Sequence, residues 1–305
     1  MRRQLPHARM NGLQDSDWDL LLDRIRSGRC TPFLGAGACH GALPLGGDVA
    51  QELATKFHYP LANSSDLTAV TQFIAVDQDL AFAKEQVLEC LRNAGPPKYQ
   101  QPPDFTAPDE PHGLLAELNL AVYMTTNYDA FLLRALKQRY KDPRRELCRW
   151  NQQVAHERSV FEEEPNYSPT PANPLVYHLH GHDECADSIV ATEDDYLKFL
   201  AKMASDPQLI PEKVQRVMRS SSFLFIGYRL ADWNFRILFE SLRVRGSFKS
   251  VAVLLPPHPE DPARAAAQEY LEKYYAEMDV RIFWGTAREF TRELRRRWEL
   301  GKGKP

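Results

Sequence analysis

Four short segments carry the residues whose types and spacing could do chemistry, and each follows an apolar run. They are Gly35-Ala36-Gly37 with Cys39 close behind, Asn127-Tyr128-Asp129, His178-Leu179-His180-Gly181-His182, and Gly227-Tyr228 ahead of Asp232. A short apolar run that ends in such a loop is typical of a buried strand. Ligands bind open α/β sheets at the carboxyl ends of the strands. We therefore expect the four segments to meet in one crevice.

The first segment has the composition of a phosphate-binding turn. Glycines let the backbone turn sharply and approach a pyrophosphate, and a following helix N-terminus would offer free N–H groups. The common dinucleotide fingerprint has a third glycine where this chain has His40. The alternative is a tight strand-to-helix turn in which Cys39 is a small buried filler.

Asn127 and Asp129 could hold a substrate. A carboxamide can bind a water or a ligand hydroxyl through its donor and its acceptor, and a carboxylate two residues on can accept hydrogen bonds from a ligand. The alternative is that one of them caps the helix predicted from Ala130 to Tyr140.

The histidines at 178, 180 and 182 would share one face of a strand, so a metal site is one interpretation. A metal needs further ligands, and the scattered cysteines do not provide them, so we expect no metal. A histidine titrates near the working pH and can act as a general base. The fourth segment follows another apolar run, where Asp232 is expected to cap a helix over 232–243 and Arg229 could pair with a phosphate.

In this order the segments resemble the sirtuin superfamily, and more closely its bacterial, defence-type NAD-hydrolysing branch. The resemblance spans roughly residues 33 to 239. It implies that Asn127 orders the attacking water and that Asp129 positions nicotinamide. It also implies that His180 takes a proton from a ribose hydroxyl, with His178 and His182 as packing or rim residues. The remaining NAD⁺ contacts would come from Gly35, Ala36, Gly37, Cys39, Gly227, Tyr228 and Asp232.

The chain also departs from the family pattern. Cys39 stands where sirtuins usually have serine, and Thr126 replaces a glutamine. The zinc-ribbon cysteines of the protein deacylases are missing. These features favour an NAD⁺ glycohydrolase, which releases nicotinamide and ADP-ribose. A protein-lysine deacylase and a non-catalytic nucleotide-binding or scaffold subunit remain the alternatives.

Strands alternate with helices along most of the chain, which predicts an α/β fold with a Rossmann-like, mostly parallel sheet and helices on both faces. We expect residues 1–305 to form one catalytic domain. Residues 48–115 would form a smaller helical insertion subdomain. Residues 142–174, which are polar and proline-bearing, would form an irregular insertion. After the run at Phe33, strands are predicted at 121–124, 175–179, 188–190, 223–226, 251–255 and 280–284.

Bulk composition excludes several classes of protein. The formal net charge is −3 and the pI about 6.3, so direct nucleic-acid binding is not expected. The apolar runs are far shorter than the roughly 20 residues of a membrane span, and the N-terminus shows no apolar signal region. Five scattered cysteines favour a reducing cytoplasm.

A constitutively active NAD⁺ hydrolase would poison its host, so we expect control by a partner or by homo-oligomerisation. The resemblance implies antiphage defence by abortive infection, with a HerA-type ATPase or an Argonaute-like protein as family-consistent partners. We expect docking at residues 142–174 or at a basic cluster, for which a solvated helix face is the alternative. The cluster comprises Arg292, Arg295, Arg296, Arg297, Lys302 and Lys304.

Overall fold

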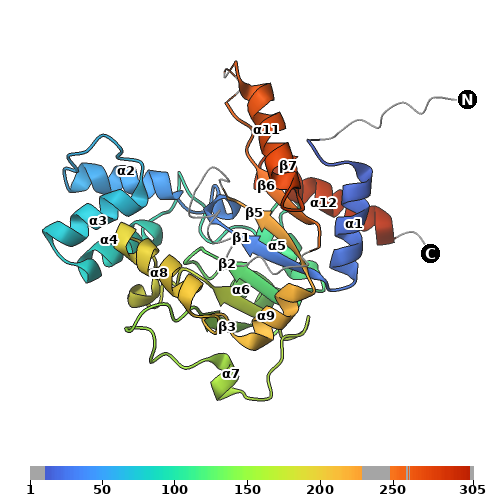
Figure 1. Cartoon of the computed structure of the whole chain (residues 1–305), viewed down its shortest axis with the longest axis horizontal. Helices are drawn as coiled ribbons and strands as arrows, with labels where there is room; N and C mark the ends of the chain where they lie inside the picture. The colour runs from blue at the N-terminus through green and yellow to red at the C-terminus, as the bar shows by residue number, and fades with distance from the viewer. Residues whose placement is uncertain (1–10, 229–247, 259, 261, 303–305) are drawn as a thin grey trace, which may run out of the picture.

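The computed structural model describes residues 11–228, 248–258, 260 and 262–302. In this part of the chain seven strands form one sheet, in the order β3-β4-β2-β1-β5-β6-β7, and every neighbouring pair is parallel. The predicted fold class is therefore confirmed (Figure 1). The strands are β1 (Cys30–Leu34), β2 (Val122–Thr125), β3 (Arg144–Leu147), β4 (Leu175–His178), β5 (Ser222–Ile226), β6 (Ser250–Leu254) and β7 (Val280–Trp284).

The order of the strands places a switch point beside β1. The chain passes outward from β1 through β2 to the edge strand β3, adds β4 between β3 and β2, and then returns to start β5 on the other side of β1. Without the edge strand β3, this is the order of the doubly wound dinucleotide-binding sheet. In such sheets the ligand crevice opens where the strand order reverses, beyond the carboxyl ends of the strands.

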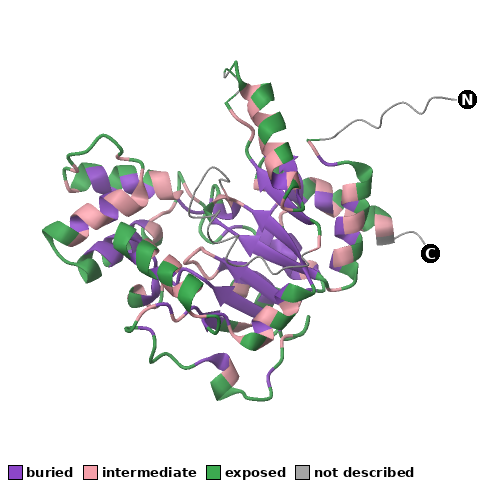
Figure 2. Ribbon diagram, in the orientation of Figure 1, coloured by how far each residue is buried: buried purple, intermediate pink, exposed green. Residues whose placement is uncertain are grey.

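Continuous apolar runs explain the central strands. Every residue of β1, β2, β4, β5 and β6 is buried, as parallel strands covered on both faces should be. Figure 2 shows these strands buried beneath helices whose outer faces are exposed.

Two sets of helices cover the sheet. One core cluster joins it to α1 (Asp15–Arg26), α5 (Pro111–Glu117), α6 (Phe131–Gln138) and α12 (Ala287–Lys302). The other cluster joins it to α7 (Val160–Glu163), α8 (Glu193–Ser205), α9 (Glu212–Arg219) and α11 (Arg264–Ala276). Trp18 of α1 stacks on Phe290 of α12 with ring centroids 5.3 Å apart, which ties the start of the described chain to its end.

The helices predicted in the 48–115 region are present. They are α2 (Gly46–Lys56), α3 (Leu67–Asp77) and α4 (Leu80–Arg92), and Figure 1 shows them packed together at one side of the sheet. Asp66 and Asp79 cap α3 and α4 by accepting backbone N–H bonds. The three helices share an apolar cluster of their own, which includes Ile189 and Ala191 from the loop after β4. The division of the chain into one domain with insertions stays a prediction.

Two sequence-based assignments were wrong. Residues 142–174 are not wholly irregular, because they contain the edge strand β3 and the short helix α7. Residues 188–190 do not form a strand, because Ser188 ends a short 3₁₀ turn, η2 (Ala186–Ser188), and the next two residues form a loop. The predicted helix over 232–243 lies outside the described residues. No helix in the described part of the chain has the length and apolarity needed to cross a membrane.

Arginines of α12 form ion pairs within the chain, and the docking role expected for them stays a prediction. Arg292 pairs with Asp109, and Arg295 pairs with Glu117 of α5. Arg296 and Arg297 pair with Glu293 on their own helix. These arginines attach α12 to the loop before α5 or pair along the helix, so their charge is compensated within the chain.

Candidate functional site

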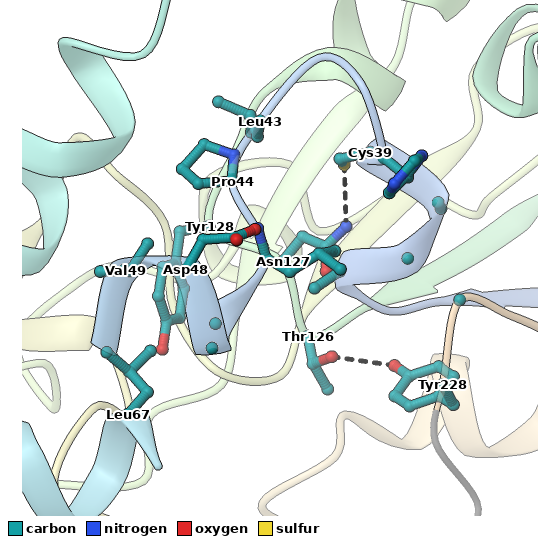
Figure 3. A pocket seen from close by; sticks show the side chains of 18 of the residues that line it. Cys39, Leu43, Pro44, Asp48, Val49, Leu67, Thr126, Asn127, Tyr128 and Tyr228 are labelled. Carbon is teal, nitrogen blue, oxygen red and sulfur yellow. Dashed lines mark hydrogen bonds between the residues drawn. The ribbon is translucent and has the colours of Figure 1, made fainter. Parts of the chain in front are cut away.

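A cavity of about 1190 Å³ opens beyond the carboxyl ends of β1, β2, β4 and β5. Its lining includes residues of all four predicted segments, together with parts of α2 and α3. Figure 3 labels Cys39, Asn127 and Tyr228 from three of these segments. The predicted site residues that line it are Ala36, Gly37, Cys39, Asn127, Asp129, His180, Gly227 and Tyr228. Of the others, Gly35 is not a lining residue but accepts a hydrogen bond from Asn127, and Asp232 and Arg229 lie outside the described residues. The expectation that the four segments form one cavity is therefore confirmed for the described residues.

The glycines of the first and last segments pack against each other. Gly37 donates its N–H to the Gly227 carbonyl at 3.0 Å, and a Cβ at Gly35 would come within 2.8 Å of the same carbonyl oxygen. Gly227 has φ +85, and a Cβ there would overlap the Ala38 amide nitrogen. These glycines permit the close approach of two loops. The element after Gly35 is the four-residue 3₁₀ turn η1 (Ala36–Cys39), so no α-helix begins directly after the glycines. The next helix, α2, begins at Gly46, which also lines the cavity.

Asn127 joins the loop after β2 to the glycine loop. Its Nδ2 donates to the Gly35 carbonyl at 3.1 Å and lies 3.2 Å from the Cys39 sulfur. Its backbone N–H is bound by the Thr125 hydroxyl at 2.9 Å, which fixes the turn as β2 ends. The carboxamide is half-buried on the cavity wall. Its contacts with Gly35 and Cys39 both use the nitrogen Nδ2.

Asp129 caps a helix with one carboxylate oxygen, and the residue also lines the cavity. Its Oδ1 accepts the N–H of Phe131 at 2.9 Å, which caps the first turn of α6. Its Oδ2 lies 3.3 Å from the Cys39 sulfur and lines the cavity. The cap holds one oxygen in place while the other stays at the wall.

His180 lies deeper than expected. The side chain touches the rings of Phe199 and Tyr196 edge-on, at centroid distances of 4.9 and 5.2 Å. Its Nε2 is buried without a hydrogen-bond partner among the described residues. Burial lowers the pKa of His180 to about 3, so the expectation of a pKa near the working pH is wrong. The imidazole is neutral under physiological conditions.

The other two histidines are buried residues rather than rim residues. The strand ends at His178, and Gly181 turns the chain with φ +89. His178 donates from Nδ1 to the Asn127 carbonyl at 3.2 Å, and burial lowers its pKa to about 3. His182 packs on His178 with ring centroids 4.8 Å apart and pairs with Asp183. His180 lines the cavity, while the other two hold the loop.

Two residues that the sequence did not single out stand behind the wall. His112 of α5 places its Nε2 3.8 Å from the Cys39 sulfur, and its Nδ1 meets Glu110 Oε1 at 2.6 Å. Burial lowers the pKa of His112, but the hydrogen bond and charge of Glu110 outweigh burial and leave the pKa raised. Burial and the Asp129 charge raise the pKa of Cys39 well above its ordinary value. Glu110 and His112 lie at the start of α5, after a loop whose sequence has no hydrophobic periodicity from which their position could be predicted.

Tyr228 closes the cavity beside the glycine loop. Its hydroxyl lies 2.9 Å from the Thr126 hydroxyl (Figure 3) and donates to the Leu34 carbonyl at 2.8 Å. Thr126, which stands where the family has a glutamine, therefore makes a structural contact with Tyr228.

The fold and the cavity define an α/β protein with a large cavity at the switch point of a doubly wound sheet. The model of the SIR2-like domain family matches residues 121–281, just over half of the 305 residues. The chain therefore belongs to the SIR2-like domain family.

The chain is also similar to curated bacterial enzymes. It is 28% identical over 134 residues to the NAD(+) hydrolase ThsA of Enterococcus faecium. The aligned region covers 44% of this chain and 25% of the relative. It is 28% identical over 140 residues to the protein of the same name from Bacillus cereus (strain MSX-D12), covering 46% and 25%. The chain thus spans about a quarter of the length of these relatives.

Proposed function

We propose that this protein is an NAD⁺ glycohydrolase that cleaves NAD⁺ into nicotinamide and ADP-ribose. The observation that carries the proposal is that Asn127, Asp129 and His180 line the same cavity as the glycine loop. Membership of the SIR2-like family supports it, as does similarity to proteins named NAD(+) hydrolases.

In the proposed reaction the bond between ribose C1′ and the nicotinamide nitrogen breaks, and its electron pair leaves with nicotinamide. Positive charge develops on the ribose, as in other glycoside hydrolyses. Water adds to C1′ and loses a proton, so NAD⁺ and water give nicotinamide, ADP-ribose and H⁺. Asp129 would hold the nicotinamide carboxamide, and Asn127 would order the water or a ribose hydroxyl.

His180 would accept a proton from a ribose hydroxyl as the C1′–N bond breaks and return it to that oxygen when water adds, so the one proton released overall comes from the water. A neutral imidazole is the form that a general base needs, and the low pKa of His180 keeps it neutral. The same low pKa makes it a weak base. Proton transfer would therefore follow the development of positive charge on the ribose, which acidifies the hydroxyls.

Product analysis tests this proposal against its closest rival. Purified protein is incubated with NAD⁺, with and without an acetylated peptide, and the products are separated by chromatography. We expect nicotinamide and ADP-ribose without the peptide. Peptide-dependent turnover that yields O-acyl-ADP-ribose would instead establish a protein deacylase. Binding of NAD⁺ without turnover under any condition would indicate a nucleotide-binding subunit.

We also propose a role in antiphage defence, with turnover raised by a partner protein in the cytoplasm. The support is the family resemblance and the toxicity of uncontrolled NAD⁺ cleavage. A HerA-type ATPase or an Argonaute-like protein encoded nearby is the partner to test first, by adding it to the turnover assay.

A further inference from the structure

Three ligand-type atoms meet at the wall of the cavity. The Cys39 sulfur lies 3.3 Å from Asp129 Oδ2 and 3.8 Å from His112 Nε2, and all three ligand atoms lie within 4.8 Å of one another. They come from η1, from the loop after β2 and from α5. Segments distant in the sequence thus bring a thiol, a carboxylate and an imidazole to one point.

We propose that Cys39, His112 and Asp129 bind one thiophilic divalent cation such as Zn²⁺. Zinc takes cysteine sulfur, histidine nitrogen and carboxylate oxygen, and in a tetrahedral site these atoms stand roughly 3.3–3.6 Å apart. The two distances from the sulfur lie at or near this range. A thiolate also disfavours the hard cations Mg²⁺ and Ca²⁺.

A second layer of contacts holds the ligands ready. Glu110 bonds His112 Nδ1 at 2.6 Å, an arrangement that fixes a metal-binding imidazole with its Nε2 toward the cation. The same carboxylate accepts the N–H of Gly113 and so caps α5. Both side chains are almost fully buried, so neither has a competing contact with bulk water.

The fourth position of this site faces the cavity. Cys39 and Asp129 line the cavity, which leaves room for water as the remaining ligand. Coordination requires the thiolate, so the Cys39 proton is released to solvent on binding. The cation would also take Asp129 away from nicotinamide. This consequence rests on the proposed function, and it makes the cation an inhibitor rather than a required cofactor.

Cobalt provides a direct probe of the site. Chelator-treated protein is titrated with CoCl₂, and the absorption of a thiolate–cobalt charge-transfer band is followed. We expect one equivalent of cobalt per chain, displacement of cobalt by ZnCl₂ and no displacement by MgCl₂. Failure to bind a stoichiometric amount of cobalt would overturn the proposal.

Matched variants assign the ligands. Cys39→Ser should abolish the band, and serine suits the position because sirtuins usually carry it there. Glu110→Gln should weaken cobalt binding by about 10–100-fold, as losses of second-layer partners do. Cys185→Ser, which changes another free cysteine outside the site, should leave the band intact. A band that survives Cys39→Ser would refute the assignment. If that variant does not fold, an unchanged cobalt affinity in folded Glu110→Gln refutes it instead.

Turnover separates this proposal from the proposed function. We expect ZnCl₂ to stop NAD⁺ hydrolysis by wild-type protein and a chelator to restore it, and Glu110→Gln should need about 10–100-fold more ZnCl₂ for the same inhibition. Stoichiometric cobalt binding without inhibition would overturn the inhibitory half alone. An absence of hydrolysis under all conditions would count against the glycohydrolase, while the cobalt spectrum would still decide the metal site.

Discussion

Asn127 and Asp129 each combine a structural contact with the position that the sequence assigns to chemistry. Asn127 binds the Gly35 carbonyl, and Asp129 caps α6. Substitutions at either residue therefore act on both loop geometry and reactivity. A readout of folding has to accompany every activity measurement at this site.

Part of the site could be predicted from residues alone, and part could not. Polar and glycine-bearing loops at strand ends were sufficient to predict which segments meet. The low pKa of His180 could not be predicted, because it depends on burial against Phe199 and Tyr196 of α8. His112 was missed because its partner Cys39 is 73 residues away in the sequence.

Gly227 provides a test at the scale of one backbone position. Gly227→Ala should destabilise the protein by roughly 1–3 kcal/mol, since alanine is strained at φ +85 and its Cβ would overlap Ala38. Gly95→Ala is the control, because a Cβ at Gly95 meets nothing within 4 Å. Denaturant unfolding of both variants checks this. Equal stabilities would contradict the packing described for the two glycine loops.

The buried histidines predict how stability depends on pH. His178 and His180 have pKa values lowered to about 3 from 6.5, so below pH 6.5 the unfolded chain binds protons that the folded chain does not. Their contribution to stability is complete above pH 6.5 and is lost as the pH falls toward 3, by about 1.4 kcal/mol per pH unit for each histidine. His178→Phe should flatten this slope, and the exposed His156→Phe should not. Identical slopes for all three proteins would show that His178 does not titrate as described.

At the scale of elements, a buried ion pair connects the α2–α4 helices to the rest of the molecule. Lys84 of α4 lies 3.2 Å from Asp195 of α8, and their side chains are 4% and 3% exposed. Burial lowers the pKa of Lys84, and the Asp195 charge opposes that shift. Asp195 also accepts the backbone N–H groups of Ala191 and Thr192, so it fixes the start of α8 beside the cavity.

Removing one partner should therefore be costly. Lys84→Ala should lower the free energy of unfolding by about 3–5 kcal/mol, because it leaves a buried charge without its partner. Arg216→Ala breaks the pair with Glu212, whose side chains are 74% and 81% exposed, and should cost less than about 1 kcal/mol. Chemical denaturation measures both. A small loss for Lys84→Ala would show that the helices are held by apolar packing alone.

The elements that were predicted wrongly have physical explanations. β3 begins Arg144-Arg145 and is partly exposed, as an edge strand can be, so it lacks the apolar run that revealed the central strands. Ile189 and Val190 are fully buried and were read as a strand. They are instead a buried loop that packs against the neighbouring helices and the sheet. Apolar runs indicate burial rather than strands: they identified the edge strand β7 as well as the central strands, but they also marked this buried loop.

At the scale of the whole molecule, assembly and control stay predictions. We expect the purified chain to form a homo-oligomer with low turnover that a partner protein raises. Light scattering combined with a turnover assay measures both properties. A monomer with full turnover and no response to a partner would contradict them. Since the α12 arginines are paired within the chain, Arg295→Ala should reduce stability and leave the oligomer unchanged.

The rate of nicotinamide release from NAD⁺ tests the central claim most directly. Wild-type protein should release nicotinamide and ADP-ribose in equal amounts. His180→Ala and Asn127→Ala, folded by circular dichroism, should lose about 10²–10⁴-fold in rate, as expected when a general base or a positioned water is removed. The exposed His156→Ala should match wild type. Near-full activity in folded His180→Ala and Asn127→Ala would contradict the account.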